Sequence, residues 1–203
     1  FAMSASETGP RRNGVFEGLA FASNYKTLFV STEEPLYQDG EKAGLEKKSY
    51  WCRIIQYDLQ RKEAVAQYAY PLDAVAQKPS PESGYVVNGI SSIIALDDKR
   101  LLVLERSFST GNISLEVKVY MVNLTGAENI QNNRSLLQNP VKKPLAKKLI
   151  FNFNSLKTMI DNLEGICFGP RLPNGNRSLL VIADNNFNPL QQTQLFLFDS
   201  GIK

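Results

Sequence analysis

The sequence of 203 residues contains no histidine, and this absence excludes several classes of chemistry. Without an imidazole the chain cannot form a Ser-His-Asp triad, a Cys-His pair or a histidine-ligated zinc site. It also lacks the side chain that most often serves as a general base near neutral pH. Any activity of this protein must therefore use other groups.

Cysteine and long hydrophobic runs are also scarce. Cys52 and Cys167 are too few for a disulfide scaffold and too far apart for a zinc knuckle, so we expect two separate buried thiols. No apolar run approaches the ~18 residues that a membrane span requires. The 23 Lys and Arg residues nearly balance the 20 Asp and Glu residues and are scattered, which gives no indication of a nucleic-acid partner.

The pattern that is present consists of short apolar runs rich in Val, Ile, Leu and Phe, separated by Gly, Pro, Asn and Asp. Such a pattern predicts an all-β protein. The expected strands are 16–21, 27–31, 53–58, 64–70, 91–96, 101–105, 116–123, 147–151, 165–168, 179–183 and 194–198. We expect one short helix over Ser155–Asp161, and solvated polar loops over 37–49, 73–85 and 125–144.

A repeat becomes visible when three segments of the chain are aligned. Each contains a small-residue strand, a tight turn, a strongly apolar strand and then a carboxylate, and the equivalent positions Gly18, Ser92 and Gly165 are 74 and 73 residues apart. Repeated hairpins with further amphipathic strands are typical of propeller blades. Because a closed propeller has ~4 to 8 blades, three repeat units predict a β-propeller or a large part of one.

Carboxylates occupy equivalent places in these units. They precede a glycine at the start of one strand or close the following strand: Glu17, Glu33, Glu34, Glu105, Glu164 and Asp184. Antiparallel pairing brings both kinds of position to the same end of a sheet. Carboxylates that converge repel one another unless a cation shares them, and Ca²⁺ accepts six to eight oxygens in loose geometry. The pattern predicts a calcium site, with turn capping or pairing to a base such as Arg106 as the alternative.

Four segments around these acids are similar to a known family. Residues 33–40, 104–108, 162–165 and 183–187 resemble the phytase-like family called "esterase-like activity of phytase", a bacterial group of β-propeller domains. The likeness runs from about Gly14 to Phe198. It implies that residues 1–203 form one domain that is the later part of a longer propeller. It also implies kinship with calcium-dependent propeller phytases, in which a metal-bound water attacks a phosphate held by metal ions and basic groups.

The resemblance and the carboxylate pattern together suggest specific roles. We expect a hydrolase that acts on a small-molecule phosphoester or ester substrate, is exported to the periplasm or the exterior, and uses Glu105, Arg106 and Glu164 in catalysis. Arg106 and Asn185 are the expected substrate-binding residues. The expected calcium ligands are Glu17, Glu33, Glu34, Asp39, Glu105, Glu164 and Asp184.

A second interpretation stays open at this point. The chain has no identifiable nucleophile, so a non-catalytic propeller that binds a protein, a glycan or a small anion also fits the sequence. If the chain is a fragment, its open sheet edges would associate with further strands or with a partner.

Overall fold

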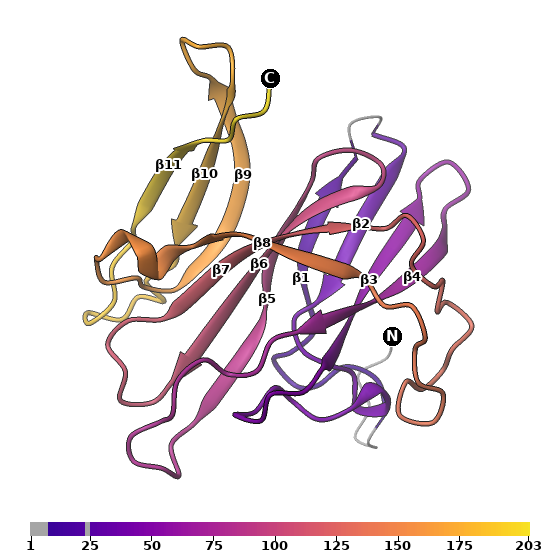
Figure 1. Ribbon diagram of the computed structural model, residues 1–203, viewed down its shortest axis with the longest axis horizontal. Coiled ribbons are helices and arrows are strands. Elements are labelled where there is room, and N and C mark those ends of the chain that lie inside the picture. Colours follow the sequence, from indigo (N-terminus) through magenta and orange to yellow (C-terminus); the bar gives the residue numbers. More distant parts are fainter. Residues whose placement is uncertain (1–7, 23–24) are drawn as a thin grey trace.

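The computed structural model describes residues 8–22 and 25–203, which form an all-β structure of eleven strands in three antiparallel sheets (Figure 1). The first sheet contains β1 (Phe16–Phe21), β2 (Thr27–Thr32), β3 (Tyr50–Asp58) and β4 (Glu63–Leu72). The second contains β5 (Val86–Ala95), β6 (Arg100–Ser109), β7 (Glu116–Asn123) and β8 (Ala146–Asn152). The third contains β9 (Leu163–Arg171), β10 (Arg177–Ala183) and β11 (Leu195–Asp199).

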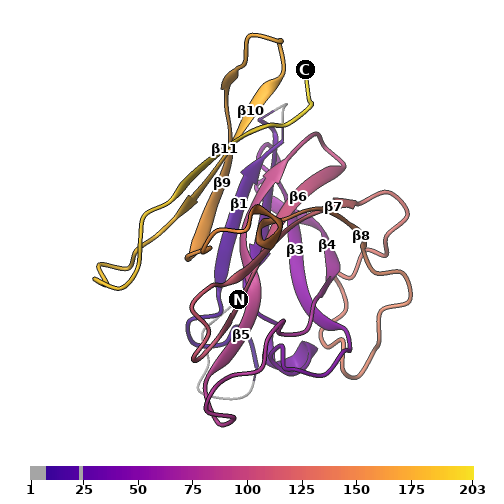
Figure 2. The same ribbon diagram turned by 60° about the vertical axis from the view of Figure 1, so that its left-hand side comes forward.

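The predicted repeat corresponds to the sheets. Each expected hairpin is the first pair of strands in its sheet, namely β1–β2, β5–β6 and β9–β10. The first strand of the second sheet, β5, contacts both β1 and β9, so the leading strands lie together (Figure 2). The sheets follow one another in chain order, and over residues 8–22 and 25–203 they form no closed barrel.

The second sheet is buried on both faces because it lies between the other two. Alternate residues of β6 point to opposite sides. Leu101 and Val103 join the apolar core shared with the first sheet, whereas Leu102 and Leu104 join the core shared with the third sheet. Charged residues farther along β6 must therefore also divide between these two interfaces.

The expected helix over Ser155–Asp161 is wrong. In its place the structure has a 3-10 turn at Phe153–Leu156, which Lys157 ends in the left-handed conformation with φ 53°. A second 3-10 turn lies at Tyr37–Asp39. The Asn152 side chain caps the Phe153–Leu156 turn by accepting a hydrogen bond from the Asn154 N–H. Beyond it, the backbone of Ile160 bonds to the segment before β7 instead of to a helical turn, accepting from the Leu115 N–H.

The polar segment between β7 and β8 is a mostly exposed loop, as its composition predicts, but Ile130, Ser135 and Leu136 within it are buried. It returns to the first sheet and covers the free edge of β4: the Ile130 N–H donates to the Gln67 carbonyl at 2.8 Å and the Leu145 N–H donates to the Ala69 carbonyl at 2.9 Å. The side chains of Ile130 and Leu145 are buried. We call residues 124–145 the edge loop.

The outward faces of the first and third sheets retain exposed apolar side chains. Leu19 and Phe21 project from the first sheet, and Ile182, Leu195 and Leu197 project from the third. In carrying apolar side chains, both outward faces are similar to the sheet faces that are buried where two of the sheets pack together.

The two cysteines differ in exposure. Cys52 is buried, as expected, whereas Cys167 on β9 is exposed, so the prediction of two buried thiols holds for one of them. Among the described residues, none of the helical segments has the length and apolar character needed to cross a bilayer.

Candidate functional site

Several of the predicted acidic residues meet around one arginine where the three sheets adjoin. Arg106 projects from β6, Glu17 lies on β1, Glu33 and Glu34 follow β2, and Glu164 lies on β9. Asn162, just before β9, completes the group. We call these six residues the junction cluster.

Arg106 connects all three sheets through its guanidinium. Its Nη2 lies 3.4 Å from Oε1 of Glu33 and 3.6 Å from Oε1 of Glu164. Its Nη1 donates to the side-chain carbonyl of Asn162, whereas its Nε is buried and has no hydrogen-bond partner among the described residues. The sequence predicts that Arg106 binds an anion. In the structure, hydrogen-bond acceptors of the protein itself already surround its guanidinium.

The backbone of Glu33 is fixed from three directions. Its N–H donates to the Val15 carbonyl at 2.7 Å, and its own carbonyl accepts from the Ile90 N–H at 3.0 Å and from the Cys52 thiol at 3.2 Å. Gly89 on β5 allows this close approach, since a Cβ there would lie 2.8 Å from Cγ of Glu33. The position of the Glu33 carboxylate is consequently set by the first two sheets.

The cluster holds more negative than positive charge. Burial raises the pKa of Glu33 to about 7; Arg106 opposes the shift, while Glu17, Glu34 and Glu164 add to it. Burial and the charge of Glu164 also raise the pKa of Glu17, again against Arg106. One guanidinium is too little to neutralise these carboxylates, and Glu33 can therefore exchange a proton near neutral pH.

A cavity of about 560 Å³ opens onto the cluster. Glu33, Glu34, Arg106 and Glu164 contribute to its wall. Lys42, which forms an ion pair with Glu34 at 3.0 Å, also lines it. This volume is in the range of small-molecule sites.

Glu105 does not belong to the junction cluster, because it points to the opposite face of β6 from Arg106. It lies in a second group, between the first and second sheets, that we call the lysine–tyrosine cluster. Its members are Tyr70, Asp73, Glu105, Lys118, Tyr120 and Lys147.

Contacts within the lysine–tyrosine cluster are short. The Lys147 Nζ lies 2.5 Å from Glu105 and 2.6 Å from Asp73, and the Tyr70 hydroxyl donates to Glu105 at 2.5 Å. Burial raises the pKa of Glu105 despite Lys147. Burial also disfavours the ionised form of Asp73, but hydrogen bonds from Lys147 and Tyr120 outweigh it and lower the pKa of Asp73.

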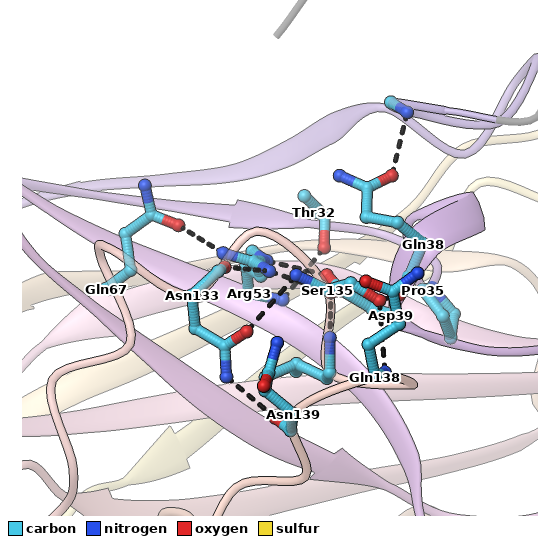
Figure 3. Close-up of polar contacts among 12 residues, drawn as sticks. Thr32, Pro35, Gln38, Asp39, Arg53, Gln67, Asn133, Ser135, Gln138 and Asn139 are labelled. Atoms are coloured by element: carbon cyan, nitrogen blue, oxygen red, sulfur yellow. Dashed lines mark hydrogen bonds and ion pairs between the residues drawn. The ribbon is translucent and has the colours of Figure 1, made fainter.

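Asp39 belongs to neither the junction cluster nor the lysine–tyrosine cluster. It forms a buried ion pair with Arg53. Figure 3 shows Arg53 between Asp39 and Gln67: its Nε and Nη2 donate to the two Asp39 oxygens at 2.6 and 2.7 Å, and its Nη1 donates to Gln67 at 2.9 Å. The carbonyl of Asn133 in the edge loop accepts from Nη2 as well. Both carboxylate oxygens of this predicted metal ligand are therefore engaged by Arg53.

Asp184 and Asn185 form the turn that follows β10. The Asp184 carboxylate accepts the Asn186 N–H at 3.0 Å, and the Asn185 side chain accepts the Phe187 N–H at 3.1 Å. Such side-chain-to-backbone bonds are common in turns. The Asp184 N–H donates to the Asn162 carbonyl at 3.0 Å, which places this turn beside the junction cluster.

The expected calcium ligands do not form a ready metal site. Within residues 8–22 and 25–203, no group of three or more His, Cys, Asp or Glu side chains is arranged to hold a metal ion. The predicted acids instead divide among the junction cluster, the lysine–tyrosine cluster, the Arg53 pair and a turn.

Sequence reasoning missed several residues of these groups. Asn162 was inside a motif that resembles the family but was not assigned a role, although it bonds Arg106 directly. Lys147 begins the expected strand 147–151 and Asp73 begins the expected loop 73–85, and neither residue was assigned a role. The only signal for Lys147 was its place at the start of that strand, and the only signal for Asp73 was its place shortly after the expected strand 64–70.

The fold and these clusters define an all-β protein of successive antiparallel sheets with a charged junction and an adjoining cavity. The family model described as "Phytase-like: Esterase-like activity of phytase" matches residues 1–187. The chain therefore belongs to this phytase-like family. No curated protein and no solved structure matches the chain. Membership of the family suggests a hydrolase of the phytase-like type.

Proposed function

We propose that the protein hydrolyses phosphoester or ester substrates at the cavity beside the junction cluster. The observation that carries this proposal is the convergence of Glu17, Glu33 and Glu164 on Arg106 at the junction of three sheets, with Glu33, Glu164 and Arg106 in the wall of a cavity. Family membership supports hydrolysis as the reaction type.

In this proposal Arg106 and Glu33 have different roles. Arg106 orients the anionic or carbonyl group of the substrate through its guanidinium. Glu33 accepts a proton from the water that adds to the phosphorus or carbonyl carbon, and the leaving oxygen is protonated from solvent. A general base is most effective when its pKa is near the working pH, and the pKa of Glu33 is about 7.

Calcium is a separate proposal. Glu17, Glu33 and Glu164 are the oxygen donors best placed to share a cation. The cation would relieve the repulsion that adds to the effect of burial in raising the pKa of Glu17 and Glu33. Hydrolysis as proposed does not pass through the ion, because these groups are not arranged as a metal site within the described part of the chain. A rise in Tm with added calcium that Glu164→Gln removes would support this part alone.

The fold proposal goes beyond the three sheets described. Sheets stacked in chain order, with leading strands in contact and apolar outward faces, suggest part of a β-propeller. In that arrangement the outward faces of the first and third sheets would be covered by further sheets or by a partner. Export to the periplasm or the exterior likewise remains a prediction.

The test is release of phosphate from p-nitrophenyl phosphate and of acetate from p-nitrophenyl acetate by the natural protein that contains this chain. We expect turnover, with kcat/KM rising through pH 7 as Glu33 ionises. Glu33→Gln should lower kcat/KM by about 10²- to 10⁴-fold. The matched control is Glu82→Gln, which removes an exposed carboxylate from the segment between β4 and β5 and should leave kcat/KM unchanged.

No turnover of either substrate by the folded protein, with calcium or with EDTA, would overturn the hydrolase proposal. It would favour the non-catalytic binding module. One observation already fits that alternative: Arg106 is occupied by Glu33, Asn162 and Glu164, an arrangement that also suits a site that only binds.

A further inference from the structure

The cavity beside the junction cluster has an apolar side as well as a charged one. Four residues of its wall, from the second sheet and the segments next to its strands, are apolar or aromatic: Tyr85, Val87, Phe108 and Leu115. We call these four residues the apolar wall. Ligand sites are commonly lined by apolar surface with a few polar groups that fix the orientation of the ligand. The apolar wall therefore indicates what the ligand carries besides the group that Arg106 holds.

The apolar wall continues the face of the second sheet from which Arg106 projects. Side chains two residues apart on a strand point the same way, so Phe108 follows Arg106 on β6, about 7 Å farther along. Across the sheet, Val87 on β5 pairs with Phe108. The ring centre of Tyr85 lies 6.3 Å from that of Phe108, and the two rings are tilted by 38°. A ligand group held by Arg106 would therefore lie about one ring's length from two aromatic side chains.

This face of β6 is covered by the third sheet at one end and open to the cavity at the other. Leu102 and Leu104 are buried in the core that the second and third sheets share. Phe108, on the same face, is only half-buried, and Tyr85 is 59% exposed. Two aromatic rings that the core does not cover, in the wall of a cavity, suit a flat apolar group of a ligand.

The charges in the wall of the cavity balance one another. It has three basic side chains and three carboxylates: Arg12, Lys42, Arg106, Glu33, Glu34 and Glu164. Most of these charges are already paired, since Lys42 contacts Glu34 and Arg106 contacts both Glu33 and Glu164. Such a wall has no surplus positive charge with which to hold a phosphate dianion. An uncharged ligand avoids repulsion by the carboxylates.

We propose that this cavity takes an uncharged ligand with an aromatic ring. For the reaction the inference rests on the hydrolase function proposed above, and under that function the ligand is a carboxylic ester whose ring is attached next to the ester group. The ester carbonyl accepts a hydrogen bond from Arg106, and the ring lies against Phe108 and Tyr85. Water adds to the carbonyl carbon and the ester C–O bond breaks, which releases a carboxylic acid and an alcohol or phenol. Tyr85 and Phe108 determine specificity and take no part in these bond changes.

The test is an NMR titration, in EDTA, of the natural protein that contains this chain with N-phenylacetamide, an uncharged amide counterpart of phenyl acetate. We expect saturable binding. N-methylacetamide, which lacks the ring, should bind at least about 10-fold more weakly, because it buries less apolar surface. Phenyl phosphate keeps the ring but is a dianion above neutral pH, where Glu33 is ionised, and should also bind more weakly than N-phenylacetamide.

Variants of the apolar wall locate the ring. Phe108→Leu should weaken binding of N-phenylacetamide by about 10-fold and Tyr85→Ser by about 3-fold, with no effect on N-methylacetamide. Tyr85→Phe keeps the ring and should retain binding, which separates loss of the contact from loss of the fold. Tyr25→Ser is the matched control: Tyr25 forms a similar tilted pair with Phe21, with ring centres 6.1 Å apart, outside the cavity, and its loss should leave affinity unchanged.

Turnover of phenyl acetate and ethyl acetate separates this inference from the hydrolase proposal. If N-phenylacetamide binds and Tyr85→Ser weakens its binding, but neither ester is hydrolysed, the hydrolase proposal fails and the ring-binding role of the apolar wall is supported. Equal affinity for N-phenylacetamide and N-methylacetamide, tighter binding of phenyl phosphate, or equal weakening by Tyr25→Ser would overturn the inference, whether or not an ester is hydrolysed.

Discussion

Arg53 and Arg106 both connect distant parts of this chain, but their surroundings differ in charge. Arg53 is buried against one carboxylate, Asp39, and its remaining donors meet Gln67 and the Asn133 carbonyl. Arg106 faces several carboxylates, and burial together with the neighbouring negative charges raises the pKa of Glu17 and Glu33. The Nε of Arg106 is left without a hydrogen bond among the described residues.

We interpret Arg53 as a structural arginine and propose that Arg106 is a functional one. A buried ion pair with matched charges and saturated hydrogen bonds holds its neighbours in one arrangement. An arginine outnumbered by carboxylates leaves unbalanced charge beside a cavity, and perturbed groups of that kind are typical of functional sites. Variants that disturb the surroundings of one arginine and leave the other intact test this difference.

The largest effect is expected on the Arg53 side. Asp39→Ala would leave the Arg53 guanidinium buried without its counter-charge, and we expect the free energy of unfolding to fall by about 3–5 kcal/mol. Urea unfolding measures this loss. The double variant Asp39→Leu with Arg53→Met should recover most of it, because both charges are then absent. A loss below about 1 kcal/mol in the single variant would contradict the structural role.

A smaller effect is expected where the first two sheets approach each other at Glu33. Gly89→Ala would place a Cβ 2.8 Å from Cγ of Glu33 and 3.1 Å from its carbonyl oxygen. We expect a loss of about 1–3 kcal/mol in urea unfolding, because the strand must move away from Glu33. Gly44→Ala is the control: its Cβ would meet only the Tyr50 hydroxyl, at 3.4 Å. Equal stability of the two variants would show that the contact is loose.

Glu33, in the junction cluster around Arg106, should also make the free energy of unfolding depend on pH. The pKa of Glu33 rises from 4.5 to about 7 on folding, so the folded protein binds a proton more tightly than the unfolded chain. Stability should thus be highest below pH 4.5 and fall by about 1–2 kcal/mol as the pH rises through 7. Thermal unfolding in EDTA at several pH values measures this.

Glu33→Gln should flatten that dependence, with a residual slope of the same sign from Glu17 and Glu105, whose pKa values are also raised. Wild-type stability that rises with pH between 5 and 8 would be incompatible with a raised pKa for Glu33.

The smallest effect concerns the thiols and leaves stability unchanged. Cys167 should react with a thiol reagent in the native protein within the time of mixing, whereas Cys52, which donates to the Glu33 carbonyl, should react only when the structure opens. The rate of Cys52 labelling then reports how often the Glu33 side of the junction opens. Immediate reaction of both thiols would contradict the burial of Cys52.

The strands and their repeat were predictable because they depend on local patterns. The expected bounds of β1 and β7 agree with the structure, and the three hairpins begin the three sheets. The convergence of Glu17, Glu33 and Glu164 also followed from their equivalent positions at strand ends.

The partners of the other acids were not predictable from such patterns. Glu105 and Arg106 were placed in one site, although the alternation of side chains along a strand sends neighbours to opposite faces. Asp39 meets Arg53, 14 residues away, and the backbone of Leu136, 97 residues away. Pairings of that range depend on how the sheets stack, and the composition of the edge loop gives no indication of its buried contacts.

The edge loop has a consequence for how the chain is made. Strands within each sheet are neighbours in sequence and can pair as soon as they leave the ribosome. The contacts of Ile130 and Leu145 with β4 form only after β5, β6 and β7 have been synthesised, because these strands lie between β4 and the edge loop in the sequence. During that interval the edge of β4 is open to other strands, so the nascent chain is most prone to aggregate before Leu145 emerges.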